Sequence, residues 1–131
     1  MSQTKLRDSL GNLQRAVGKL EEALSYSLEQ PLVAEGTVQR FEFVIELFWK
    51  TFKRALEFEG RMTKTPRESV KEAFAAGWIT DETVWLDMIQ CRNETSHLYL
   101  HPELVTTICG RIAGFRSEIR SRCDFLVARY L

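Results

Sequence analysis

Apolar residues recur at helical spacing along almost the whole chain, and no stretch shows the alternation of a β-strand. In the first expected helix, residues 3–28, a strict four–three spacing appears at Leu6, Leu10, Leu13, Val17, Leu20 and Leu24. This spacing is typical of the seam along which helices pack together. We prefer the core of an antiparallel bundle to an intermolecular coiled coil, because so few heptads are marginally stable alone.

The second expected helix, residues 33–60, is unusually apolar. Eight of the twelve residues from Phe41 to Phe52 are apolar or aromatic. One polar stripe remains, formed by Glu42, Glu46, Lys50 and Lys53. Within it, Glu46 and Lys50 stand in the favourable i, i+4 order for an ion pair. A helix this apolar is buried around most of its circumference. We therefore expect it to be either the central helix or one shared between the core and an interface.

Turn and cap signals divide the middle of the chain. Thr65-Pro66-Arg67-Glu68 is a capping box that opens a short third helix, and Gly77 ends this helix as a left-handed cap. Thr80 is expected to cap the fourth helix. That helix should continue to about Leu100, because His101 precedes Pro102 and is pushed out of helical space.

The fifth expected helix runs from Pro102 to about Tyr130. Gly110 and Gly114 lie one turn apart in it, and each costs about 1 kcal/mol relative to alanine. Their benefit would be a close helix–helix approach, such as a dimer interface. The pattern as a whole predicts an all-α fold, an antiparallel up-and-down four-helix bundle with one additional short helix, forming a single domain over residues 1–131.

Composition removes several functions from consideration. Lysine plus arginine equals aspartate plus glutamate at 18 each, so any RNA binding would need a local basic patch or a basic partner. No apolar run approaches the ~20 residues needed to span a membrane, and no signal peptide is evident. Three cysteines without paired spacing indicate reduced thiols in a cytoplasm. With two histidines and no Cys-x-x-Cys, neither a metal nor a cofactor is expected.

The candidate chemistry lies in the octet of residues 92–99, expected in the last two turns of the fourth helix. There Arg92, Ser96 and Tyr99 would form one line, with Asn93 and His97 in a second line beside it. The planar charge of Arg92 suits a phosphate, and His97 can act as general base or acid. Asn93 and Ser96 can orient these groups or bind a ribose hydroxyl. This set suits metal-independent RNA cleavage by attack of a 2′-hydroxyl.

A plainer interpretation also stands. An arginine and a histidine near a helix end commonly cap carbonyls or pair with acids, and suitable acids are near in sequence: Asp87, Glu94 and Glu103. The same holds for His101, which we expect to be a capping or surface residue. One motif also supplies one histidine, although the cleavage benefits from both a base and an acid. A two-fold dimer would bring a second copy of the motif.

The octet matches a family pattern of arginine, four residues, histidine, one residue and tyrosine. The chain resembles the HEPN superfamily, and within it the small proteins encoded beside minimal nucleotidyltransferases. Three further segments support the resemblance in family order: residues 40–50, 65–77 and 85–88. The resemblance covers residues from about Arg40 to Tyr99, and the flanking helices fit in length.

The resemblance implies specific roles. Arg92 and His97 would be the ribonuclease pair, and Asn93 the polar residue that follows the arginine. The protein would form a homodimer or higher oligomer with paired motifs at a shared cleft, with interface positions among Phe41, Trp49, Gly110 and Gly114. Tyr99 would accept adenylyl groups from the partner nucleotidyltransferase, which would block the cleft by bulk and charge.

Three functions follow from this resemblance and from the residues. The first is the toxin of a HEPN and minimal nucleotidyltransferase toxin–antitoxin pair, an endoribonuclease neutralised by adenylylation (AMPylation) of Tyr99. The second is a non-catalytic nucleotidyltransferase substrate-binding subunit that complements a separate catalytic chain. The third is a plain structural bundle. The intact motif favours the first, whereas the neutral charge leaves the second open.

Overall fold

The long apolar second helix is the centre of the fold. In the computed structural model, which describes residues 3–131 apart from the Tyr99 side chain, α2 (Pro31–Phe58) packs against the four other α-helices. These are α1 (Gln3–Leu24), α3 (Pro66–Ala75), α4 (Glu82–Thr95) and α5 (Val105–Tyr130). Two 3₁₀ turns, η1 (Leu98–Leu100) and η2 (Pro102–Leu104), connect α4 to α5.

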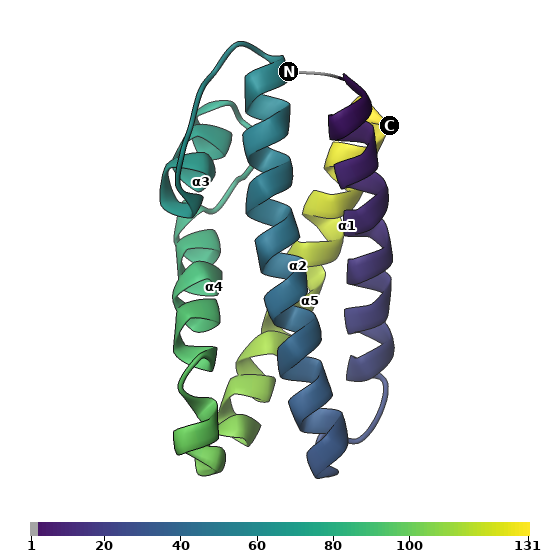
Figure 1. Ribbon diagram of the computed structural model, residues 1–131, viewed down its shortest axis with the longest axis vertical. Coiled ribbons are helices and arrows are strands. Elements are labelled where there is room, and N and C mark those ends of the chain that lie inside the picture. The colour runs from purple at the N-terminus through teal and green to yellow at the C-terminus, as the bar shows by residue number, and fades with distance from the viewer. Residues whose placement is uncertain (1–2) are drawn as a thin grey trace.

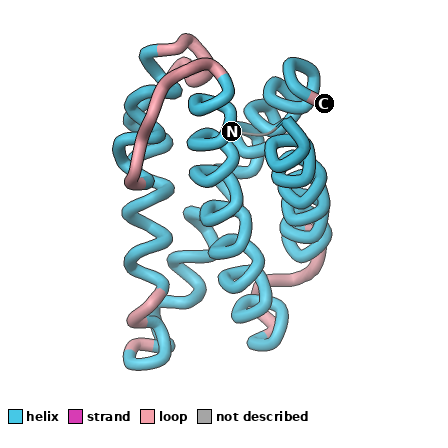
Figure 2. Tube along the Cα trace, turned by 45° about the horizontal axis from the view of Figure 1, so that its top comes forward, coloured by secondary structure: helices cyan, strands magenta, loops and turns pink. Residues whose placement is uncertain are grey.

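The long helices alternate in direction. Figure 1 shows α1 and α4 running down the view and α2 and α5 running up it, with the short α3 above α4 and beside the upper part of α2. The tube in Figure 2 shows helices joined by loops, and the described residues include no strand. The predicted all-α, up-and-down four-helix bundle with one extra short helix is therefore confirmed.

The leucine seam of α1 lies in the bundle core. Five of its six members are almost fully buried against the rest of the chain, and Leu24 is half-buried; the five are Leu6, Leu10, Leu13, Val17 and Leu20. The bundle interpretation is thus confirmed for this helix. The helix ends at Leu24, four residues before the expected end, and α2 begins at Pro31 instead of residue 33.

An aromatic cluster fixes α4 on α2. The ring of Trp85 meets the rings of Phe48 and Phe52 edge-on, with centroids 4.7 and 5.2 Å away. Its indole Nε1 donates a 2.7 Å hydrogen bond to Glu118 of α5, so the buried ring has no unpaired donor. Two turns after this anchor, Arg92 comes to lie over the polar stripe of α2.

Caps define the two helices that lead into the octet. The Thr65 hydroxyl accepts from the Glu68 backbone N–H, as predicted, and Gly77 has the predicted left-handed conformation with φ +82°. The prediction for Thr80 is wrong. Asp81 caps α4 instead, and its carboxylate accepts from the Val84 N–H at 3.2 Å. A carboxylate at this position also complements the helix dipole.

The fourth helix ends at Thr95, about five residues earlier than predicted. The Thr95 and Ser96 hydroxyls bond to the carbonyls of Arg92 and Asn93, three residues back, and such bonds compete with helical geometry. His97 then leaves the helical region, with φ −106° and ψ 3°, and Leu98 turns into the core. The two predicted lines of residues therefore do not extend past Ser96.

The described residues include no helix long and apolar enough to span a membrane.

Candidate functional site

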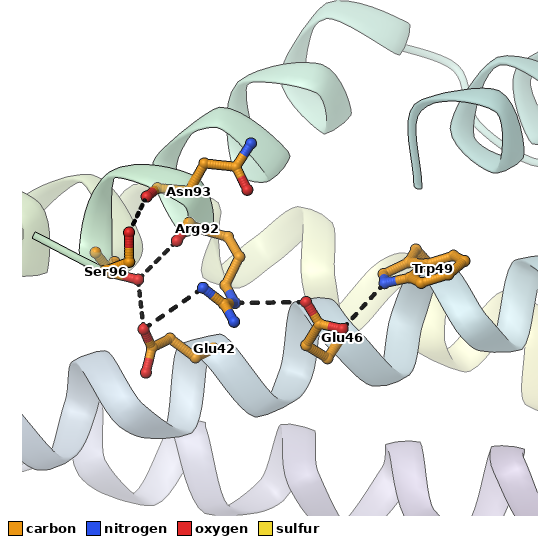
Figure 3. A network of polar contacts seen from close by, with 7 residues as sticks. Glu42, Glu46, Trp49, Arg92, Asn93 and Ser96 are labelled. Carbon is orange, nitrogen blue, oxygen red and sulfur yellow. Dashed lines mark hydrogen bonds and ion pairs between the residues drawn. The ribbon is translucent and has the colours of Figure 1, made fainter. Parts of the chain in front are cut away.

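Arg92 is held between two carboxylates of α2. Its Nη1 lies 3.7 Å from Glu42 Oε2, and its Nε lies 3.6 Å from Glu46 Oε1 (Figure 3). The two glutamates are one helical turn apart, so their side chains flank the guanidinium from the same face of α2. The Arg92 side chain remains 28% exposed, which leaves part of its charged fork accessible to a ligand.

Each of these carboxylates has a second partner that fixes it. The Trp49 indole N–H donates to Glu46 Oε2 at 3.2 Å. The Thr95 hydroxyl lies 2.5 Å from Glu42 Oε2 and 2.7 Å from the Arg92 carbonyl, and its single proton can be donated to either. Because both partners of Arg92 are themselves positioned, the guanidinium has a defined place at the surface.

The arrangement nevertheless leaves Arg92 incompletely satisfied. Its Nε is buried, and it has no hydrogen-bond partner among the described residues, since the contact to Glu46 is an ion pair without hydrogen-bond geometry. One guanidinium and two carboxylates also give a local charge of −1. In a single chain this charge weakens the attraction of the site for phosphate.

The other residues of the octet lie at the exposed end of α4. Asn93 is exposed, and its side-chain amide points away from the two carboxylates in Figure 3. The Ser96 hydroxyl donates to the Asn93 carbonyl at 2.9 Å, so it caps the helix end. His97 follows directly and is exposed. The structure thus brings Arg92, Asn93 and His97 to one end of α4, whereas the Tyr99 side chain lies outside the described residues.

The acids near the octet in sequence have other partners. Asp87 and Glu94 both bind Arg111 of α5, at 3.0 and 2.5 Å, and Glu103 lies 3.5 Å from His101. The carboxylates that hold Arg92 come from α2, much earlier in the chain. Sequence analysis paired Glu46 with Lys50, but the ion pair described for Glu46 is with Arg92. The only feature of the sequence that indicated these partners of Arg92 is the i, i+4 pair of Glu42 and Glu46 on an otherwise apolar helix.

The suggested interface residues differ in exposure. Phe41 is fully buried and stacks on Phe115 with a centroid distance of 6.0 Å, so its ring belongs to the chain's own core. Trp49 is half-buried. An added Cβ at Gly110 or Gly114 would meet nothing within 4 Å, so these glycines serve no close helix approach within the chain.

An apolar residue that the sequence did not single out is exposed near this site. Phe43 is 59% exposed on α2, and it lines a groove of about 740 Å³ between α1 and α2. Glu46 also lines this groove, so the groove adjoins the carboxylates around Arg92. A large exposed aromatic ring in a groove that also contains a partner of Arg92 is a feature of interaction surfaces.

The cysteines are structural. All three thiols are buried, and burial raises the pKa of Cys91 and Cys123 to about 11 and also raises that of Cys109. Their thiolate forms are therefore scarce at neutral pH. Among the described residues, no group of three histidine, cysteine or acidic side chains is arranged to hold a metal.

The family follows from the comparison with known proteins. Residues 8–127 match the family described as nucleotidyltransferase substrate binding protein like, and the chain belongs to this family. This finding confirms the resemblance to the small partners of minimal nucleotidyltransferases.

Two relatives illustrate the match. Over 97 residues the chain is 35% identical to "Probable ribonuclease HepT" of Haemophilus influenzae. The aligned region covers 70% of this chain and 66% of that protein. A crystal structure of a protein from Thermus thermophilus superposes with a TM-score of 0.74 at 24% identity, covering 90% of this chain and 98% of that one. The second match supports the fold alone.

Proposed function

We propose that this protein is the toxin of a HEPN and nucleotidyltransferase toxin–antitoxin pair, a metal-independent endoribonuclease that acts in the cytoplasm. The observation that carries the proposal is Arg92, a partly exposed fork suited to phosphate that two carboxylates position, with the exposed His97 at the same end of α4. The likeness to a protein named as a ribonuclease supports the same activity.

The proposed reaction uses the 2′-hydroxyl of the RNA as nucleophile. His97 takes its proton, the 2′-oxygen attacks the adjacent phosphorus, and Arg92 stabilises the charge that develops on the phosphoryl oxygens. The bond to the 5′-oxygen breaks, and that oxygen leaves with a proton from a general acid. The products are a 2′,3′-cyclic phosphate and a 5′-hydroxyl.

A second protomer would supply the general acid. One chain carries one octet and therefore one His97, so we propose a two-fold homodimer in which the partner subunit's His97 protonates the leaving oxygen. The exposed ring of Phe43 and the half-buried Trp49 lie on the face of α2 next to Arg92 and suit such an interface. Gly110 and Gly114 offer a second open surface for assembly.

Neutralisation would act on Tyr99. The tyrosine oxygen would attack the α-phosphorus of ATP bound by the partner nucleotidyltransferase, and pyrophosphate would leave. The added phosphodiester carries a negative charge two residues from His97, which would repel RNA from the site. Mass spectrometry after incubation with the nucleotidyltransferase encoded nearby tests this step, and the absence of adenylyl addition at Tyr99 would remove it.

A second candidate function rests on the same geometry. Glu42 and Glu46 outnumber Arg92 and give the cluster a charge of −1, which suits protein contacts better than RNA. The alternative is thus a non-catalytic subunit that binds a nucleotidyltransferase and completes its substrate site, in line with the family description.

Cleavage of RNA by the purified protein separates the two functions. We expect a panel of tRNA and mRNA to be cut with a chelator present, and the Arg92→Ala and His97→Ala variants to be inactive. His101→Ala is the matched control, because this second exposed histidine lies outside the proposed pair. Equal degradation by wild type and both variants, or none by wild type, would favour the non-catalytic subunit.

A further inference from the structure

A basic hollow lies between α1 and α2, and Trp49 is one of the residues that line it. It has a volume of about 310 Å³, and we define it by its lining residues, Lys5, Trp49, Lys50, Lys53, Arg54 and Glu57. Four of these residues are cations and one is an anion, which gives a local charge of +3 in a chain whose net charge is zero. This is the local basic patch that RNA binding would require.

The positive charges in the hollow are arranged at a cost to the helix. Lys50 stands three residues before Lys53 and four before Arg54, and like charges at these spacings destabilise a helix. One acid offsets them, since Lys53 lies 3.9 Å from Glu57. Counting Glu46, which stands four residues before Lys50, two acids lie at helical spacing from the three cations, and the remaining positive charge favours a ligand of opposite charge.

Trp49 joins the basic hollow to the Arg92 site. Its ring lines the hollow, and its indole N–H donates to Glu46, which lies 3.6 Å from Arg92. Figure 3 shows Trp49 and Glu46 in succession along α2, with the side chain of Arg92 reaching from α4 to Glu46. A strand whose scissile phosphate lies at Arg92 would therefore place neighbouring nucleotides over Trp49 and the lysines.

We propose that the basic hollow is a second binding site for single-stranded RNA, in which Lys50, Lys53 and Arg54 contact backbone phosphates and Trp49 stacks on a base. The proposal rests on RNA being the substrate of the proposed function. A basic groove with an interposed aromatic ring is the arrangement by which proteins bind single strands without sequence preference. The hollow also supplies the attraction for phosphate that the negatively charged cluster around Arg92 lacks.

Concavity and polarity favour RNA over a protein partner at this position. The groove beside the exposed ring of Phe43 shares Lys50 with the basic hollow, but four of its nine lining residues are charged, whereas five of the six residues that line the hollow are. Protein interfaces are depleted of charge at their centres and are poor in lysine.

Binding is tested in the full-length His97→Ala variant, so that cleavage does not consume the probe. The probe is a fluorescent single-stranded RNA of roughly 12 nucleotides, followed by anisotropy at several salt concentrations. Lys50→Gln with Arg54→Gln should weaken binding and reduce the salt slope by about 1.4, the value for two lost phosphate contacts. The control pair Arg67→Gln with Lys71→Gln removes the same charge from the exposed face of α3 and should leave the slope nearly unchanged.

Stacking on Trp49 has its own pair of variants. Trp49→Leu should weaken RNA binding by about 5- to 150-fold, whereas Trp49→Phe keeps a ring and should lose much less. Both variants remove the hydrogen bond to Glu46, so the difference between them reports stacking. Equal losses in the two variants would contradict the stacking role.

Other outcomes overturn the assignment or separate it from the proposed function. If ATP displaces the RNA probe and binds the hollow with higher affinity than the RNA does, the hollow is a nucleotide site. A changed oligomeric state of the Lys50→Gln, Arg54→Gln variant with unchanged RNA affinity would make it a protein interface. RNA binding that depends on the hollow, without cleavage by wild type, would refute the nuclease alone. Cleavage that requires Arg92 but is indifferent to the hollow variants would refute the hollow alone.

Discussion

The Nε of Arg92 lies 3.6 Å from a carboxylate oxygen of Glu46, although the two residues belong to different helices and are far apart in sequence. This contact, with the matching one to Glu42, gives the arginine that we propose to bind phosphate a fixed position and makes the net charge of the cluster −1. The same two carboxylates therefore orient the arginine and compete with its ligand. The balance between these effects can be measured.

Glu46→Gln should separate orientation from affinity. The change removes one negative charge beside Arg92, so KM for RNA should fall, while the loosened guanidinium should reduce kcat by about tenfold. Steady-state cleavage of one short RNA gives both constants. Glu72→Gln is the control, because it removes a carboxylate of α3 that contacts Arg61 and lies outside both the Arg92 cluster and the basic hollow. A rise in KM with unchanged kcat would contradict the positioning role.

Trp85 should be among the side chains that contribute most to stability. It is 1% exposed, packs against two phenylalanine rings and donates to Glu118. Trp85→Ala should lower the free energy of unfolding by about 3–5 kcal/mol, through lost burial and the cavity left behind. Urea unfolding followed by circular dichroism measures this change. Trp49→Ala, at the half-buried surface, should cost less, and equal costs would contradict the proposed core.

Substitution by alanine should change the stability of the fold in opposite directions at Gly77 and Gly114. Gly77 has φ +82°, where a side chain is strained, so Gly77→Ala should destabilise the fold by about 1–2 kcal/mol. Gly114→Ala should instead stabilise the single chain by about 1 kcal/mol, because its Cβ meets open space within a helix. Thermal unfolding gives both shifts. If Gly114→Ala also dissociates a dimer in light scattering, the helix face around it is an interface.

Alkaline pH should destabilise the fold through its buried thiols. Burial raises the pKa of Cys91 and Cys123 from 9.0 to about 11, so the folded state binds more protons than the unfolded state between these values. The contribution of each protonated thiol to the free energy of unfolding is therefore fully present below pH 9. It decreases as the pH rises, by about 1 kcal/mol for each thiol at pH 10. Urea unfolding at pH 8 and pH 10 in a reducing buffer tests this. A Cys123→Ala variant should show a smaller pH dependence, and an identical one would contradict the assignment.

The sequence predicted the fold because hydrophobic periodicity is a local property. The seam of α1, the apolar α2 and the glycine cap at Gly77 each follow from residues within one or two turns. The end of α4 did not follow, because it depends on the hydroxyls of Thr95 and Ser96 and on the burial of Leu98. The proline signal lay several residues further on.

The candidate site was only half predictable. The residues of the octet were identified from their chemistry and from the family pattern, but the partners of Arg92 were not. Local spacing favoured Glu46 with Lys50, whereas packing of α4 on α2 places Glu46 beside Arg92. Packing likewise gathers Lys50, Lys53 and Arg54 with Lys5 of another helix into one hollow, which the neutral overall charge concealed.

The ends of the cleaved RNA test the central claim most directly. If His97 activates a 2′-hydroxyl beside Arg92, wild-type protein with a chelator present must leave 2′,3′-cyclic phosphates and 5′-hydroxyls, and both Arg92→Ala and His97→Ala must abolish these products. Fragments with 5′-phosphates, or the same cyclic ends from the His97→Ala variant, would contradict the account.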